Sequence, residues 1–363
     1  MCAMQEILFY APHNNLLRNN LFFQLENNPL GQYGYNALPA HVLKQELAGV
    51  GYDAKTIDLA SNLGSAKAII FLSVPKKSDK YYQYCLKNCL QDRMYLVVDE
   101  PSVVNPENYK RENHLNFRKV LTWFDQLVDN KKYFKYFFPA PVHYGSVKMA
   151  DLLPFEKRKL VCMIAGNKYS RHPNQLYTER LNVIRYLERA HPAEFDLYGT
   201  DWDIPVVHHP AFHYMPMEPF SLNNALKKIC KLTGIRLRQQ FPSSKSVVLN
   251  KKEVLGKYLF TACYENQDNT QGYVTEKIID PLLAGAVPVY YGSENLRGHI
   301  PEGCYINSKK FSSFAEVYEY IHGMGQAEYS GYIQNIKTFI TGPKFYPFTI
   351  EAYVEVMKKF LDI

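Results

Sequence analysis

Two charged residues stand at the start of a predicted helix, after a buried strand and a polar loop. The strand is predicted over 258–264, and Thr275 then caps a helix whose first turn holds Glu276 and Lys277. Helix amino termini attract anions, so a lysine at this position opposes the helix dipole and needs an explanation. Either the pair binds a diphosphate and sugar hydroxyls at the carboxyl edge of a sheet, or it is only a charged pair at the start of a helix.

An arginine interrupts the apolar side of another predicted helix, over 176–191. Val183, Ile184 and Leu187 share one narrow sector of this helix. Arg180 projects from the centre of that sector, where a guanidinium is costly unless it meets an anion. Its partner is predicted to be either an internal Asp or Glu or a phosphate group bound by bidentate hydrogen bonds.

Two carboxyl groups end a buried strand in the first half of the chain. The strand, predicted over 94–99, delivers Asp99 and Glu100 at its carboxyl end, and Pro101 stops it. Such a position suits a general base, because ligands of open α/β sheets bind at this edge. The alternative is that either carboxylate caps the following turn.

Residue types that bind metal ions occur in two loops. Asp201-Trp202-Asp203 has the letters of an Asp-x-Asp motif, but it follows a strand only after an intervening loop. His208, His209 and His213 cluster without a carboxylate in register. No metal site is therefore predicted.

The elements that must position these residues alternate along the chain. Short apolar runs are followed by helix-period segments, which is typical of parallel sheets wrapped by helices. The pattern loosens over 133–157, and 363 residues suit two domains better than one. We predict an α/β fold with two facing Rossmann-like domains, residues 1–150 and 151–345, and a final helix in 346–363 that packs back on the first domain.

Composition excludes several classes of protein. At 47% hydrophobic residues the chain is not disordered, and no apolar run approaches the roughly 20 residues of a membrane span. The amino terminus lacks the pattern of a secretory signal, so a cytoplasmic protein is expected. The net charge of +7 reflects either solvated surface cations or an anionic ligand, and no basic stretch interleaved with aromatics indicates nucleic acid.

The segment 273–292, with Asn266 before it, resembles the donor-binding signature of the α1,3/4-fucosyltransferases, glycosyltransferase family 10. Tyr-x-Thr-Glu-Lys and Gly-x-Val-Pro-Val follow one another there at family-like spacing. The resemblance covers about 159–339 and includes Gly166-Asn167-Lys168. It implies a GT-B type enzyme that uses GDP-fucose and inverts the anomeric centre.

The resemblance also implies roles for individual residues. Arg180 and Lys277 would neutralise the diphosphate, and Glu276 would bind sugar or ribose hydroxyls. Tyr273 and Asn266 would help to bind the nucleotide.

Glu100 best matches the family's catalytic base, which is a glutamate near the end of a strand in the first domain. The expected acceptor is an oligosaccharide or lipopolysaccharide, with the fucose α1,3-linked to N-acetylglucosamine or glucose. Because two cations can stabilise the leaving group, neither a metal nor another cofactor is expected.

Two other functions stay open: a GT-B transferase that uses another nucleotide-sugar, and a non-catalytic glycan-binding protein on the same fold. Contact with a membrane surface stays open as well.

Overall fold

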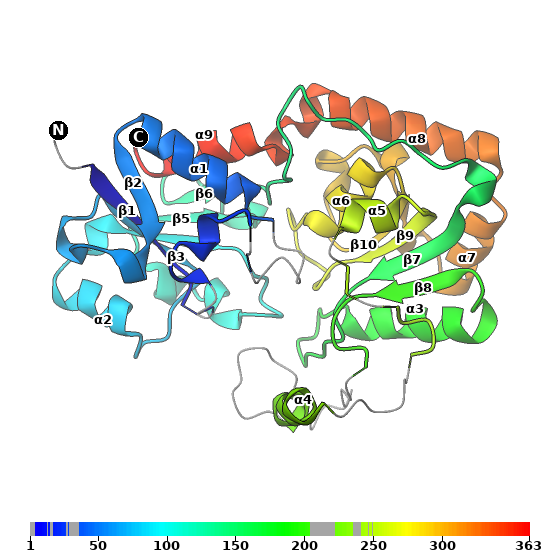
Figure 1. Cartoon of the computed structure of the whole chain (residues 1–363), viewed down its shortest axis with the longest axis horizontal. Coiled ribbons are helices and arrows are strands. Elements are labelled where there is room, and N and C mark those ends of the chain that lie inside the picture. The colour runs from blue at the N-terminus through cyan, green and yellow to red at the C-terminus, as the bar shows by residue number, and fades with distance from the viewer. Residues whose placement is uncertain are drawn as a thin grey trace. The chain divides into compact units, whose positions relative to one another are not determined.

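The chain folds into two compact units. The computed structural model describes residues 4–12, 14, 17–26, 28, 36–203, 222–234, 241–245, 247–248 and 250–363 (Figure 1). Of these, unit 1 comprises the residues up to Tyr144 together with Tyr346–Ile363, and unit 2 comprises Gly145–Phe345 apart from its undescribed positions. Both units are parallel α/β structures.

Unit 1 contains a six-stranded sheet in the order β2-β1-β3-β4-β5-β6, in which every neighbouring pair is parallel. The strands are β1 (Gln5–Tyr10), β2 (Tyr52–Thr56), β3 (Ala68–Leu72), β4 (Met94–Val98), β5 (Lys119–Thr122) and β6 (Tyr133–Lys135). All five residues of β4 are buried, as expected for a central parallel strand covered on both faces.

Three neighbouring strands of unit 1 end in register. Asp99, Trp123 and Tyr136 are each the first residue after β4, β5 and β6, respectively. Because side chains alternate along strands and residues in register share a face, these three lie on one face at the carboxyl edge of the sheet. The indole of Trp123 donates a hydrogen bond to the carbonyl oxygen of Asp99 at 3.0 Å.

Helices cover both faces of the unit 1 sheet. They are α1 (Leu38–Gly49), α2 (Lys80–Lys87) and α9 (Ile350–Phe360). Phe360 of α9 packs against Tyr95 and Phe134, with ring centroids 5.1 and 6.2 Å away, on the face that also carries Asp99. Tyr82 of α2 packs against Phe71 in the core of the other face.

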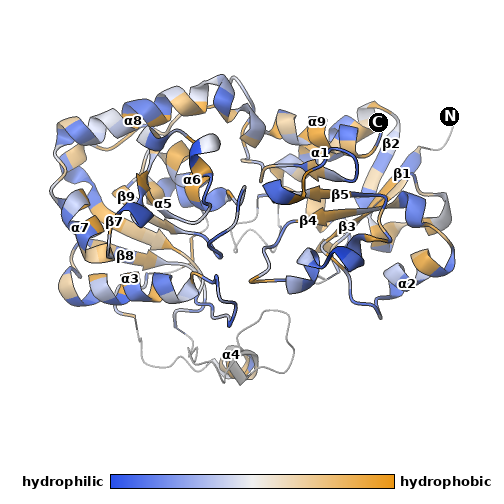
Figure 2. Ribbon diagram, turned by 180° about the vertical axis from the view of Figure 1, so that it is seen from behind, coloured by the Kyte–Doolittle hydropathy of each residue, from blue (hydrophilic) through white to orange (hydrophobic). Residues whose placement is uncertain are grey.

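Unit 2 contains a five-stranded sheet in the order β11-β10-β9-β7-β8, again with parallel neighbours. Its strands are β7 (Lys159–Ile164), β8 (Phe195–Tyr198), β9 (Tyr258–Tyr264), β10 (Val287–Tyr291) and β11 (Ile306–Asn307). In Figure 2 the strands of both units are hydrophobic, whereas the surrounding helices alternate between polar and apolar residues. Each unit therefore has its core against its own sheet.

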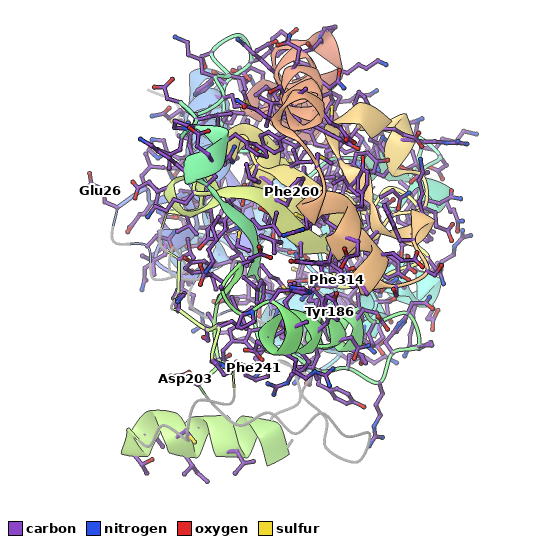
Figure 3. All side chains as sticks on the ribbon, turned by 90° about the vertical axis from the view of Figure 1, so that its right-hand side faces the viewer. Glu26, Tyr186, Asp203, Phe241, Phe260 and Phe314 are labelled. Carbon is purple, nitrogen blue, oxygen red and sulfur yellow. The ribbon has the colours of Figure 1, made fainter. Side chains whose placement is uncertain are left out.

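The described helices of unit 2 are α3 (Tyr177–Ala190), α4 (Leu222–Thr233), α5 (Lys251–Leu255), α6 (Glu276–Ala284), α7 (Phe314–His322) and α8 (Gln326–Thr341). Tyr186 of α3 and Phe314 of α7 pack with ring centroids 6.0 Å apart (Figure 3). Gly285 caps the C-terminus of α6 with a left-handed φ of 71°, a conformation that favours glycine.

Candidate functional site

A buried carboxylate fixes the loop between β9 and α6. Glu265, the first residue after β9, is fully buried, and its carboxylate accepts a hydrogen bond from the backbone N–H of Thr275 at 3.1 Å. The hydroxyl of Thr275 lies 2.9 and 2.8 Å from the two carboxylate oxygens. A side chain at Gly292 would collide here, because its Cβ would lie 2.6 Å from the Cγ of Glu265. The loop is therefore held in one position by packing and hydrogen bonds.

The predicted cap of α6 is present. The hydroxyl of Thr275 accepts a hydrogen bond from the backbone N–H of Lys277 at 3.3 Å, and Ile278, Ile279 and Leu282 are buried on one side of the helix. This arrangement leaves Lys277 at the first turn, with its ammonium 3.1 Å from a carboxylate oxygen of Glu276 and 3.7 Å from one of Glu265.

A pocket opens beside this turn, within unit 2. Its volume is about 410 Å³, including space open to solvent. The carboxyl ends of β7 and β9 and the helices α3, α5 and α6 line it. Three cationic side chains, those of Arg180, Lys251 and Lys277, meet there with the carboxyl groups of Glu276 and Asp280. The carboxyl edge of an open parallel sheet is where α/β proteins bind their ligands.

Arg180 lines the pocket but is itself 97% buried, since its exposed fraction is 3%. Its Nε and Nη2 donate to the carbonyl oxygen of Tyr264 at 3.0 and 2.7 Å, and Nη2 also donates to the amide oxygen of Asn266 at 2.8 Å. The sequence predicts an Asp, Glu or phosphate partner, and the partners inside the chain are instead neutral. Burial accordingly lowers the pKa of Arg180.

Neutral partners satisfy the hydrogen bonds of a guanidinium without cancelling its charge. Among the described residues, no carboxylate lies within ion-pair distance of Arg180, so its charge is available to an anionic ligand.

Two buried residues, Asn266 and Tyr273, help to hold Arg180 in position. Both are buried, and the amide of Asn266 donates to the hydroxyl of Tyr273 at 3.4 Å. The carbonyl oxygen of Tyr273 accepts the hydroxyl of Tyr290 at 3.2 Å. The structure therefore connects Asn266 and Tyr273 with Arg180 in one hydrogen-bonded group.

Ion pairs set the ionisation of the pocket. The side chain of Glu276 is exposed, and the ammonium groups of Lys277 and Lys251 outweigh the desolvation that opposes its ionisation and lower its pKa to about 2. The ammonium of Lys251 lies 2.7 Å from the carboxylate of Asp280, and despite burial Asp280 and Glu276 raise the pKa of Lys251.

The sequence predictions did not include Lys251. A signal was present, because Asn250 caps α5 through the N–H of Glu253 and places Lys251 in the first turn, against the helix dipole. Lys277 showed the same anomaly in α6.

The two carboxyl groups at the end of β4 differ in environment. Glu100 is exposed, whereas Asp99 is half-buried and accepts the backbone N–H of Glu100 at 2.8 Å. Burial, followed by the negative charge of Glu100, raises the pKa of Asp99 to about 7. The proton affinity of Asp99 is therefore matched to neutral pH.

An aromatic hollow lies in unit 1 between the end of β6 and α9, with a volume of about 560 Å³ including open solvent. Its lining consists of Lys135, Tyr136, Phe137, Tyr346, Pro347, Ala352, Tyr353, Glu355 and Val356. The hydroxyl of Tyr136 is buried and has no hydrogen-bond partner, and burial and the charge of Asp99 raise the pKa of Tyr136. The hollow is thus apolar, with one unsatisfied hydroxyl near Asp99.

The structure adds little about the remaining candidate residues of the sequence. Trp123 is fully buried, and Asp201 adopts a left-handed φ of 68° in the loop after β8. His208, His209 and His213 lie outside the described residues. Across the described ranges, no cluster of three or more His, Cys, Asp or Glu residues is arranged to bind a metal ion. Among those same residues, no helix combines the length and apolarity needed to cross a bilayer.

The fold is shared with solved glycosyltransferases. A crystal structure of an α1,3-fucosyltransferase with GDP superimposes with a TM-score of 0.54 and 14% identity, over 100% of this chain and 92% of that one. A second, with GDP-fucose, has a TM-score of 0.50 and 15% identity over 100% and 93%. At such identities the likeness is one of fold, and it confirms the prediction of a GT-B architecture built from two Rossmann-like domains.

The sequence comparisons are confined to part of the chain. Residues 222–344 match the family described as "Glycosyltransferase family 10 (fucosyltransferase) C-term". The α-(1,3)-fucosyltransferase FucT of Helicobacter pylori is 39% identical over 74 residues, which are 20% of this chain and 15% of that protein. The GDP-fucose protein O-fucosyltransferase 3 of Gallus gallus is 33% identical over 96 residues, 25% of this chain and 20% of that protein.

These matches thus span only 15% and 20% of the two curated relatives. The matched family segment contains Asn266, Tyr273, Glu276 and Lys277. The predicted resemblance to glycosyltransferase family 10 is confirmed.

Proposed function

We propose that the chain is a glycosyltransferase that moves fucose from GDP-fucose to a glycan hydroxyl with inversion of the anomeric centre. The observation that carries the proposal is the pocket beside α6, where Arg180, Lys251 and Lys277 converge and Arg180 has only neutral partners. A nucleoside diphosphate is the anion that suits this charge at the carboxyl edge of the sheet. The match of this segment to a fucosyltransferase family supports fucose as the sugar.

In this proposal the donor is bound by charge and by hydroxyl recognition. Lys277 and Arg180 neutralise the diphosphate, and Lys251 adds a third positive charge to the same pocket. Glu276, ionised at neutral pH because its pKa is about 2, accepts hydrogen bonds from ribose or sugar hydroxyls. Asn266 and Tyr273 act through Arg180, whose position they fix.

The transfer step needs one base and stabilisation of the leaving group. The acceptor oxygen forms a bond to the anomeric carbon of fucose while the bond from that carbon to the phosphate oxygen breaks. Its proton passes to a carboxylate, and the bonding electron pair leaves with GDP. Attack opposite the leaving group inverts the anomeric centre, and the pocket cations stabilise the charge that develops on GDP.

Two carboxylates are candidates for the base. Glu100 is the residue that the family resemblance selects, and its exposure makes it accessible to an acceptor. Asp99 is the second candidate, because burial and Glu100 raise its pKa to about 7, near the pH at which a base works best.

The acceptor in this proposal is an oligosaccharide or lipopolysaccharide whose N-acetylglucosamine or glucose receives an α1,3-linked fucose. The aromatic hollow between β6 and α9 suits a sugar, since ring faces pack on apolar sugar faces and the unpartnered hydroxyl of Tyr136 can bond a sugar hydroxyl. It lies on the same face of the sheet as Asp99.

We further propose that transfer needs neither a metal ion nor another cofactor, because three lysine and arginine charges are already placed at the pocket. Activity measured after treatment with EDTA is expected to stay within about twofold of the untreated value. A loss that added Mg²⁺ or Mn²⁺ restores would contradict this part of the proposal.

Thermal shift with GDP, UDP and CMP, followed by transfer assays with GDP-fucose, tests the function. We expect stabilisation by GDP and release of GDP only when a lactosamine-type or chitobiose-type acceptor is present. Stabilisation by UDP alone would point to another nucleotide-sugar. Binding of glycans without turnover of any donor would identify a glycan-binding protein on the same fold.

A further inference from the structure

The positive charge of the chain is concentrated in one segment. Between Glu218 and Glu253 there are eight Lys and Arg residues and no Asp or Glu. The remaining 34 basic residues are balanced by the 35 acidic residues of the whole chain, so this segment accounts for the entire net charge of +7. Such an excess differs from a background of solvated surface charge, which would be spread along the sequence.

Helix α4 lies at the centre of this segment. Its sequence, Leu-Asn-Asn-Ala-Leu-Lys-Lys-Ile-Cys-Lys-Leu-Thr, combines three lysines with four large aliphatic residues and contains no acidic residue. The helix lies at the periphery of unit 2 (Figures 1 and 3). It is a basic amphipathic helix by composition.

The outward side of α4 is partly apolar. Ile229 and Leu232 are 53% and 77% exposed, and Lys228 beside them is exposed too. Positions 225, 228, 229 and 232 follow one another at helical spacing and so share a face. Cys230, in contrast, is buried and lies on the opposite side. Exposing aliphatic side chains to water is unfavourable. A lysine beside them is favourable at a surface that presents apolar and anionic groups next to one another.

We propose that α4 binds the surface of an anionic lipid bilayer, with Ile229 and Leu232 inserted at the level of the acyl chains and Lys228 at the headgroups. The proposal goes beyond the glycosyltransferase function and does not depend on it. An anionic lipid surface has negatively charged headgroups above an apolar acyl layer. It therefore complements a helix face that carries both lysine and aliphatic side chains.

The composition of the segment favours lipid over other polyanions. Phe220 and Phe241 are the only aromatic residues between Glu218 and Glu253 and neither lies in α4, whereas proteins that bind single-stranded nucleic acids or sugars stack aromatic rings on them. Six Leu and Ile residues accompany the five Lys and Arg residues of 222–238. Nucleic acids and acidic polysaccharides offer the charge but no acyl layer for these side chains.

Co-sedimentation of the full chain with phosphatidylcholine vesicles, with and without phosphatidylglycerol, tests the proposal. We expect binding only when the anionic lipid is present, and weaker binding as salt is raised. The triple variant Lys227→Gln, Lys228→Gln, Lys231→Gln and the double variant Ile229→Ser, Leu232→Ser should each weaken binding by roughly tenfold or more.

Matched variants separate this surface from general charge and exposure. Lys337→Gln, Lys344→Gln, Lys359→Gln removes three exposed lysines elsewhere, and Leu115→Ser removes a leucine that is 74% exposed in unit 1. Both should bind vesicles as the unaltered chain does. Unchanged melting temperatures of the α4 variants, with unchanged stabilisation by GDP, would show that only membrane contact has been lost.

Three results would overturn the proposal. The first is that the chain does not bind anionic vesicles. The second is that the control variants lose as much vesicle binding as the α4 variants do. The third is that the chain binds RNA or heparin through α4 but does not bind vesicles.

Discussion

The carboxyl edges of the two sheets have the same backbone architecture and opposite chemistry. In unit 2 the edge carries three basic side chains, those of Arg180, Lys251 and Lys277, around a pocket. In unit 1 the corresponding edge carries Asp99, whose pKa burial raises to about 7, beside an aromatic hollow. The first environment stabilises negative charge and the second takes up a proton, which are the two requirements of transfer from a nucleoside diphosphate sugar.

The two edges also differ in how their side chains are held. Glu265, Thr275 and Lys277 form a closed set of hydrogen bonds and ion pairs within one loop and helix. In unit 1 the buried hydroxyl of Tyr136 has no hydrogen-bond partner among the residues that the structure describes. The pocket beside α6 is therefore organised before any ligand binds, whereas the hollow contains a polar group whose hydrogen bond is unmade.

Removing the base should have the largest effect. If Glu100 is the base, Glu100→Gln lowers kcat by about 10²–10⁴-fold with little change in GDP affinity. Asp99→Asn is the paired variant, and whichever substitution produces this loss identifies the base. If Asp99 is the base, the kcat of the unaltered enzyme should also fall as pH drops through about 7. Near-normal transfer by both variants would contradict the assignment of a proton acceptor to this edge.

Removing a pocket cation should have the next largest effect. Lys277→Met keeps the length of the side chain and removes its charge, so kcat/KM for GDP-fucose should fall by about 10²-fold. Steady-state kinetics and calorimetry with GDP measure this loss. Lys310→Met removes an exposed lysine of the same unit, whose side chain is 60% accessible, and should leave both quantities unchanged. Equal behaviour of the two variants would remove the cation pocket from donor binding.

Removing the unpartnered hydroxyl of Tyr136 should affect only the acceptor. Tyr136→Phe is expected to raise the acceptor KM by roughly tenfold, because a sugar hydroxyl loses its bonding partner. Chain stability should stay the same or rise, since a buried hydroxyl without a hydrogen bond is removed.

Tyr82→Phe is the control for that prediction. The hydroxyl of Tyr82 accepts the amide of Asn116 at 2.8 Å, so its removal should lower the melting temperature and leave the acceptor KM unchanged. An unaltered acceptor KM in Tyr136→Phe would argue against the hollow as the acceptor site.

The raised pKa of Asp99 predicts a smaller, pH-dependent effect on stability. Because the folded pKa is about 7 and the unfolded value is near 3.8, stability is full below about pH 4 and is lost as pH rises toward 7. Asp99→Asn cannot ionise, so at pH 8 it should be more stable than the unaltered chain by on the order of 2 kcal/mol.

Thermal denaturation at pH 4 and pH 8 measures this difference. Asp129 provides a control of opposite sign, because hydrogen bonds from backbone N–H groups, chiefly that of Tyr133, lower its pKa. Asp129→Asn should therefore lose stability at pH 8 rather than gain it. Equal stabilities of Asp99→Asn and the unaltered chain at both pH values would show that Asp99 is not buried as described.

The same comparison explains what the sequence could predict. One part of the pocket beside α6 lies within a continuous loop and helix, so the cap at Thr275 and the unusual Lys277 were visible as local patterns. Two Rossmann-like domains were likewise visible, because alternating apolar strands and helices repeat through the chain.

What escaped the sequence depends on contacts between distant segments. The aromatic hollow joins Tyr136 to Tyr353 of the last helix, and periodicity does not reveal that packing. The partners of Arg180 are a carbonyl oxygen and an amide rather than a carboxylate, which only the approach of α3 to the end of β9 determines. The clustering of basic residues around α4 is visible in the sequence. It points to a binding surface only once Ile229 and Leu232 are known to be exposed.

The most direct test of the central claim is a donor assay on the unaltered chain. GDP-fucose, GDP-mannose and UDP-sugars are each incubated with lactosamine-type and chitobiose-type acceptors, and the products are measured by mass spectrometry. We predict a fucosylated acceptor and an equal amount of GDP with GDP-fucose alone, and the loss of both in Lys277→Met. Transfer from a UDP-sugar, or no transfer from any donor while GDP still binds, would contradict the account.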